Sequence, residues 1–140
     1  MFTIHETNPD LATSGALVAV KLWVPRSVQS AREPIETTAE IGTSFACTYI
    51  QEGVATSLGL EPTGTVKITS TTKPVSVAQR YLIRLVFPQN NLAFEVQAIE
   101  VPYMLRPSVR IKCLIGRDIL QHAVLTYNGL SNMFALEFRA

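Results

Sequence analysis

Charged residues are scarce in this chain: Asp, Glu, Lys and Arg together make up 16% of its 140 residues, whereas hydrophobic residues make up 47%. The formal net charge is only +1, and the Lys and Arg residues are scattered without a basic run. A chain with this balance has no electrostatic reason to bind nucleic acid or an anionic membrane surface. Its apolar surplus instead favours packing against a partner subunit.

Cysteine is also rare. Cys47 and Cys113 have no CxxC spacing and no pair of histidines nearby, so the sequence gives no reason to expect a zinc site. We expect two buried, reduced thiols; a disulfide between them is an alternative that nothing in the sequence supports. We expect no metal and no other cofactor.

Long hydrophobic runs are absent. The most apolar run, residues 16–24, is interrupted by Lys21 and is far shorter than the roughly 20 residues of a membrane-spanning helix. No signal peptide is visible at the N-terminus. The sequence therefore predicts a soluble, cytoplasmic protein that does not bind membranes.

What the chain does contain is a series of short strands. Segments that are apolar on both faces, or that alternate with period two, are typical of strands. Turn residues at 88–91 join two of them into a hairpin, and Asn128-Gly129 marks the last turn. We expect strands over residues 15–25, 35–41, 65–70, 75–87, 92–99, 111–116, 124–127 and 133–138.

Two short helices are expected between these strands. In the first, Ile50, Val54 and Leu58 fall at i, i+4 and i+8, and Thr48 has the spacing of a capping box with Gln51. Gly59 follows where a glycine commonly ends a helix.

The second helix is expected over residues 117–123, with Asp118 as its cap. Many short strands with only two short helices favour a single all-β barrel or sandwich over residues 1–140. We expect residues 1–15 to be a flexible N-terminal segment.

Four segments carry a more specific signal: LWVPRSVQS, CTYIQEGVATSLGLEPTGTV, ITSTT and LIGRDILQHAVLTYNG. In this order they resemble the bacterial branch of the retropepsin-like (retroviral-type) aspartic peptidases, the half-size, homodimeric relatives of pepsin. The resemblance runs from about Leu17 to Phe138. It implies an all-β closed barrel, the half-lobe of an acid protease, with one or two short helices. It also implies a homodimer that binds a peptide or protein substrate without a cofactor.

The active-site loop departs from this family. Members carry Asp-Thr-Gly-Ala-Ser after an apolar strand residue, and the same positions here are Gly42, Thr43, Ser44, Phe45 and Ala46. The family mechanism needs two carboxylates that share one proton, and each subunit of the dimer supplies one. Glycine at position 42 removes both carboxylates at once. The sequence therefore predicts an inactive variant, or pseudoprotease.

Other family elements are present by resemblance. The hallmark apolar pair and glycine, which cross behind the active-site loop, are Leu114, Ile115 and Gly116, followed by Arg117 and Asp118. Thr43 is the family residue that hydrogen-bonds across the dimer axis, and residues 134–138 correspond to part of the dimer sheet. The substrate-binding flap corresponds to Thr69, Ser70, Thr71, Thr72 and Lys73.

Three functions remain open from the sequence. The first is an inactive scaffold that still dimerises and captures peptides by strand addition beneath the flap. The second is a working enzyme in which Glu40, on the same strand face as residue 42, replaces the lost acid. The third is an assembly module whose groove is filled by Phe45. His5 and His122 belong to no catalytic pattern, and we expect them at the surface or in packing.

Overall fold

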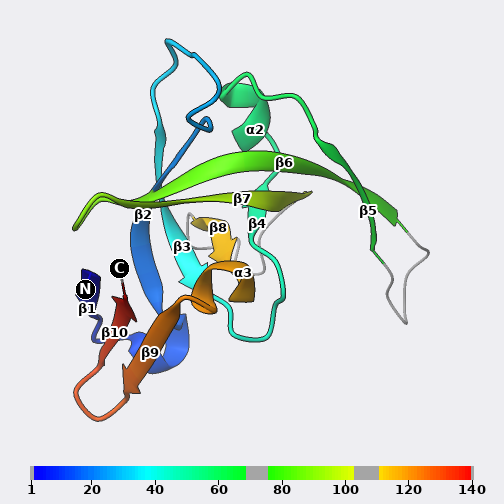
Figure 1. The fold of residues 1–140 in the computed structure, drawn as a ribbon. Helices are drawn as coiled ribbons and strands as arrows, with labels where there is room; N and C mark the ends of the chain where they lie inside the picture. The colour runs from blue at the N-terminus through cyan, green and yellow to red at the C-terminus, as the bar shows by residue number, and fades with distance from the viewer. Residues whose placement is uncertain (1, 69–75, 103–110, 140) are drawn as a thin grey trace.

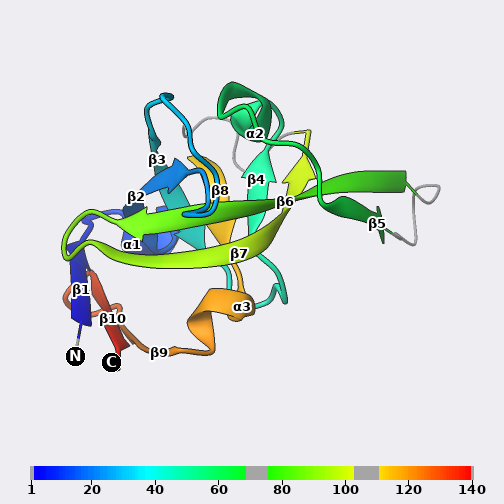
Figure 2. The ribbon, with the colours of Figure 1, turned by 45° about the horizontal axis from the view of Figure 1, so that its top comes forward.

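The computed structural model describes residues 2–68, 76–102 and 111–139. Six strands are hydrogen-bonded in a ring that closes when the last strand, β6, pairs again with the first, β2 (Figure 1). The hairpin formed with β5 (Gly64–Ile68) extends from β6 beyond the ring (Figure 2). In ring order the strands are β2 (Leu17–Trp23), β3 (Ile35–Ile41), β8 (Ile111–Ile115), β4 (Tyr49–Gln51), β7 (Leu92–Val101) and β6 (Ser76–Phe87).

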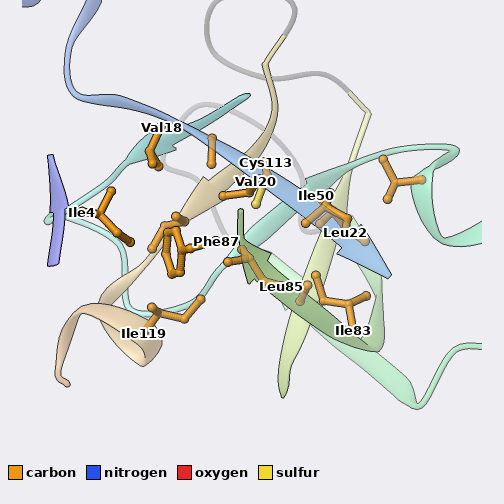
Figure 3. Packing of buried hydrophobic residues seen from close by; sticks show 14 of the residues in the cluster. Ile4, Val18, Val20, Leu22, Ile50, Ile83, Leu85, Phe87, Cys113 and Ile119 are labelled. Atoms are coloured by element: carbon orange, nitrogen blue, oxygen red, sulfur yellow. The ribbon is translucent and has the colours of Figure 1, made fainter. Parts of the chain in front are cut away.

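The hydrophobic core lies inside this ring because alternate residues of the strands point inward. In β6 the inward residues include Ile83, Leu85 and Phe87, all fully buried. They pack against buried side chains from the facing strands, among them Leu22 of β2 and Cys113 of β8 (Figure 3). The alternation seen in the sequence therefore corresponds to an inside and an outside of a barrel, and the expected closed-barrel, all-β fold class is confirmed.

A second, three-stranded sheet lies beside the barrel and contains both ends of the described chain. Strand β10 (Met133–Phe138) occupies its centre, with β1 (Phe2–Thr7) on one side and β9 (Ala123–Asn128) on the other. The expectation of a flexible segment over residues 1–15 is therefore wrong for most of its length. β1 is held by its pairing with β10, Ile4 is fully buried, and α1 (Leu11–Ser14) follows it.

β10 lies at the centre of this sheet, and the expected place of residues 134–138 in a dimer sheet stays a prediction. Both edges of these residues have intrachain partners, so a second subunit that adds a strand to this sheet would do so at β1 or β9. Its side chains Phe134, Leu136 and Phe138 point into the core and are buried. The unpaired edges of this sheet belong to β1 and β9.

The first predicted helix is shorter than expected. Ile50 belongs to β4 and pairs with Cys113, and α2 covers only Val54–Ser57, with Gly53 at its N-cap. Ile50, Val54 and Leu58 are all buried, but the first is buried from a strand. The second helix, α3, covers Arg117–Leu120, within the predicted range.

The remaining elements agree with the sequence. The hairpin of β6 and β7 pairs Phe87 with Leu92 around the predicted turn. The predicted flap residues 69–73 lie outside the described residues. Among the helices of the described chain, none has the length and apolar character needed to cross a bilayer.

Candidate active-site loop

The loop of residues 42–46 leaves the end of β3 and leads toward β4, and β8 lies between these two strands. Its first residue is fixed to β8, because the Gly42 amide donates a hydrogen bond of 2.8 Å to the Ile115 carbonyl. The loop turns back at once, since the Phe45 amide donates to the Gly42 carbonyl at 3.2 Å. Gly42 is buried, whereas Thr43 and Ser44 are exposed.

No acidic side chain belongs to this loop, and the space that one would need at position 42 is occupied. A Cβ atom built on Gly42 would lie 2.6 Å from Leu114 Cδ2 and 3.0 Å from Phe45 Cδ2. Leu114 is buried, and its Cδ2 is the far end of a flexible side chain, so a change of rotamer would relieve the shorter contact. The backbone of Gly42 does not require glycine through a positive φ. It is the close packing of the Leu114 and Phe45 side chains, and not the backbone conformation, that favours glycine at this position.

Phe45 lies half-buried against an apolar cluster outside the main core. The cluster is built on Ile111 and Leu114, with Phe45, Tyr49 and other partly buried side chains around them. The Phe45 and Tyr49 rings meet edge to face, with centroids 5.7 Å apart and planes at 76°. This geometry is favourable for aromatic pairs. Phe45 therefore fills the surface next to Gly42.

A carboxylate does support the loop, but from behind. Asp118 accepts hydrogen bonds from both the Thr48 amide (2.9 Å) and the Thr48 hydroxyl (2.7 Å). Thr48 is fully buried, and its hydroxyl oxygen in turn accepts from the Gly116 amide at 3.3 Å. Thr48 is not a helix cap. The N-cap of α3 is Gly116, and Asp118 lies in the first turn of this helix, where its Oδ1 also accepts from the Ile119 amide at 2.9 Å. Asp118 therefore binds a first-turn amide and joins the end of the loop to the helix.

The segment from Leu114 to Asp118 approaches the loop backbone very closely. A Cβ on Gly116 would lie 2.1 Å from the Cys47 carbonyl oxygen, a distance that real structures do not show. Beyond Gly116, the Arg117 and Asp118 amides donate to the carbonyls of Phe45 (2.8 Å) and Ala46 (3.2 Å). The Arg117 guanidinium donates to the Thr43 carbonyl at 2.9 Å. The loop is therefore held along most of its length by this one segment.

The other candidate residues lie in different surroundings. The Glu40 carboxylate approaches Gly15, with Oε1 3.3 Å from the place of a Cβ on that glycine, whereas position 42 faces Leu114. His122 stacks on Phe94 with ring centroids 5.9 Å apart, which is a packing role. Both cysteines are free, and complete burial raises the pKa of the Cys113 thiol. Within the described ranges, no three His, Cys, Asp or Glu side chains cluster closely enough to hold a metal ion.

An apolar hollow of about 290 Å³ adjoins the exposed side of the loop. It is lined by Thr43 of the loop, by Arg117, Leu120 and Gln121 of α3 and the turn after it, and by Leu125 of β9. Nothing in the sequence pattern marked this surface, because its residues come from three separate segments. Position 43, at which the family pattern places a dimer contact, therefore lies next to the unpaired edge of β9.

This combination of a closed barrel with a loop crossed from behind by β8 and α3 defines the retropepsin-like fold. The structure is similar to a retropepsin-like aspartic protease from Rickettsia conorii, with a TM-score of 0.58 and 11% sequence identity over 96% of this chain and 90% of that chain. The retroviral protease-like domain of Ddi1 from Leishmania major gives a TM-score of 0.48 and 9% identity, over 89% of this chain and 94% of that domain. No family model and no curated protein matches the sequence. At these identities the likeness establishes the fold, and the chemistry has to be argued from the loop.

Proposed function

We propose that this chain is a pseudoprotease of the retropepsin fold: a dimeric assembly module built on an aspartic endopeptidase scaffold that does not itself hydrolyse peptide bonds. The observation that carries this proposal is the absence of any acidic side chain from residues 42–46, with Gly42 at the position of the family aspartate. The Leu114 and Phe45 side chains lie close beside Gly42, 2.6 and 3.0 Å from the place of a Cβ atom. Peptide hydrolysis on this scaffold needs two carboxylates close enough to share a proton, and a symmetric pair of these loops supplies none.

The test is a cleavage assay with a broad peptide library between about pH 3 and 7. It compares the chain as given with Gly42→Asp/Ser44→Gly and with a triple variant that adds Phe45→Ala. The triple variant removes one of the two side chains that meet a Cβ at position 42. We expect no cleavage by the chain as given, and more cleavage by the triple variant than by the double one.

Cleavage by the chain as given would overturn the inactive assignment. In that case the next variant is Glu40→Gln, because Glu40 is the acid nearest in sequence to the loop. Loss of activity in that variant would support an enzyme with rebuilt chemistry. Gly42→Asn/Ser44→Gly/Phe45→Ala is the matched control for the triple variant, since it has a similar shape without a carboxylate.

The dimer in this proposal forms through β9 and the hollow beside the loop. β9 has a free backbone edge, and an exposed sheet edge is a template for pairing with another chain. Val124 and Tyr127 on this strand are 51% and 53% exposed, large fractions for apolar side chains. Leu125, which shares a face of this strand with Tyr127, lines the hollow together with Thr43. A second copy that pairs along β9 would bring two such loops toward one another.

The test of the dimer is its mass in solution, measured by analytical ultracentrifugation over a range of concentrations. Val124→Asp places a charge on the proposed interface and is expected to shift the protein to monomer. Val77→Asp is the matched control, because Val77 is a strand valine that is 64% exposed but lies on β6. A monomeric parent chain, or equal dissociation in both variants, would contradict the proposed interface.

Peptide capture is the second candidate function. In this function, backbone N–H and C=O groups of the flap would pair with the captured peptide. The flap, residues 69–73, is assigned by the family resemblance alone. Phe45 argues against capture, because its ring covers the apolar cluster next to the loop. A binding assay with the peptide library distinguishes peptide capture from the assembly module, because the assembly module is expected to bind no peptide. Phe45→Ala is expected to expose the apolar cluster and to leave the dimer intact.

A further inference from the structure

On the barrel wall formed by β2 and β6, the surface has a shallow hollow of about 350 Å³ that is open to solvent. Its apolar lining comes from Trp23, Val24, Pro25 and Val28, and its polar lining from Arg26, Gln29, Ser30 and Arg84. Except for Arg84, these residues belong to the family-like segment LWVPRSVQS, but none of them lies in the active-site loop, in residues 114–118 behind it or in the flap. The volume lies within the range of sites that bind small molecules.

The walls of this hollow are held in place by hydrogen bonds. Pro25 and Val28 close a turn in which the Val28 amide donates to the Pro25 carbonyl at 3.0 Å. The Trp23 indole donates from Nε1 to the Arg32 carbonyl at 3.1 Å, which fixes the orientation of the ring. The Arg32 guanidinium in turn donates to the Thr56 and Ser57 carbonyls of α2. The segment after β2 is therefore anchored at both ends.

Two guanidinium groups border the hollow without a partner. Trp23 and Arg84 are directly opposite in the pairing of β2 with β6, and Arg26 follows three residues after Trp23. Neither the Arg26 nor the Arg84 side chain makes a hydrogen bond or ion pair to any part of the chain that the structure describes. Arginine has five N–H donors in a fixed fork, a shape complementary to carboxylate and phosphate oxygens.

The one acid nearby is engaged elsewhere. Glu95 lies opposite Arg84 in the pairing of β6 with β7, where opposite charges commonly pair. Its Oε2 instead accepts a hydrogen bond from the Arg26 backbone amide at 3.1 Å. This contact orders the turn and leaves both guanidinium groups available. With Glu95 included, the three charged side chains carry a net charge of +1.

We propose that this hollow is a binding site for a small ligand with one oxyanion group, a carboxylate or a phosphate, attached to a flat apolar ring. Arg26 and Arg84 bind the oxyanion, and the Trp23 and Pro25 surfaces pack against the ring. A guanidinium fork binds such a group through two parallel hydrogen bonds. The Gln29 amide supplies a further donor. The site is independent of the loop at Gly42 and of the proposed dimer.

The chain offers an internal reporter, because Trp23 is its only tryptophan. The experiment titrates the full chain with phenyl phosphate, benzoate and benzyl alcohol at constant ionic strength and follows tryptophan fluorescence, with calorimetry as a second readout. We expect saturable binding of at least one anion and none of the neutral alcohol. The tighter of the two anions identifies the oxyanion as phosphate or carboxylate.

The variants separate charge recognition from folding. Arg84→Gln is expected to weaken binding at least tenfold, and Arg26→Gln, at an exposed turn position, to weaken it several-fold without changing the fold. Arg139→Gln removes the same charge at an exposed position outside the hollow and is expected to bind normally. The proposal is overturned by the absence of saturable binding, by equal binding of benzyl alcohol, or by equal weakening in Arg139→Gln.

Discussion

The loop of residues 42–46 and the segment of residues 114–118 behind it touch along their length but differ in how they make contact. The loop contributes mainly backbone atoms, including the Gly42 amide and the Phe45 and Ala46 carbonyls. The segment contributes the Asp118 carboxylate and a glycine that leaves room for the Cys47 backbone. Backbone atoms are the same in every residue type, so these supports do not depend on which side chains the loop carries. The segment of residues 114–118 depends on residue type, because its contacts need the carboxylate of Asp118 and the missing Cβ of Gly116.

The strongest way to break this arrangement is Gly116→Ala. Gly116 has an extended backbone that any residue can adopt, but a Cβ there would overlap the Cys47 carbonyl group. Because backbone must move to relieve the overlap, we expect a loss of about 3 kcal/mol or more in the free energy of unfolding. Urea denaturation measures the loss.

Gly129→Ala is the matched control, since a Cβ there has only an ordinary contact of 3.5 Å with Tyr127. We expect its stability to stay within about 0.5 kcal/mol of the parent. An equal effect at both glycines would show that the crossing at Gly116 is not tight.

A smaller effect is expected from Asp118→Ala. The buried Thr48 amide and hydroxyl would both lose their acceptor, and unsatisfied buried donors are costly. We expect a loss of about 2–3 kcal/mol, read from the urea midpoint. Asp10→Ala is the control, because the Asp10 side chain makes no capping hydrogen bond to α1. A loss below 1 kcal/mol for Asp118→Ala would indicate that water or another group replaces the carboxylate.

Phe45→Ala sharpens the comparison from the side of the loop. The ring is half-buried against Tyr49 and the Leu114 cluster, so its removal is expected to cost about 1–2 kcal/mol, less than for a core phenylalanine. Amide hydrogen exchange should show the Gly42, Arg117 and Asp118 amides still protected. Loss of that protection would mean that the ring, and not the backbone contacts, holds the loop.

The smallest effect concerns Tyr49, which lies between the two regions. Burial, with Cys47 and Asp118 as further causes, raises the pKa of its phenol. Above about pH 10 the unfolded chain loses this proton more readily than the folded one, so stability falls as pH rises. Between pH 8 and 10.5, the melting temperature of Tyr49→Phe should fall less than that of the parent protein. The raised pKa values of Tyr81 and Cys113 are common to both proteins and cancel in the difference.

Much of the barrel was predictable from the sequence because its strands alternate between inside and outside. The hairpin of β6 and β7 shows this well, with turn residues between two clearly periodic segments. The place of Ile50 was not predictable in this way. Ile50, Val54 and Leu58 are all buried, as their helical spacing predicted. They lie in a strand, in a short helix and at its C-cap, so the helix inferred from this spacing was too long.

Contacts between distant segments were the other limit. The hydrogen bond between Thr48 and Asp118 joins residues 70 positions apart. Each residue could also cap a nearby helix, and the sequence pattern favours that local role over the distant one. β1 carries a weak alternation, and it is held by distant partners, β10 along one edge and the Gln89 side chain at His5. By contrast, the absence of an acidic residue from positions 42–46 was visible at once, because it depends on residue type alone.

The pairing of β1 with β10 joins the two ends of the described chain. Phe2 lies opposite Phe138, so β1 finds its partner only when a strand more than 120 residues away along the chain has formed. Until then Ile4 has no sheet to bury it, and closing so long a loop is entropically costly and slow. The same neighbourhood brings the two ends of the described chain side by side. A short linker should therefore join them, and a circularly permuted chain opened at another loop would carry β10 and β1 as consecutive strands of one hairpin.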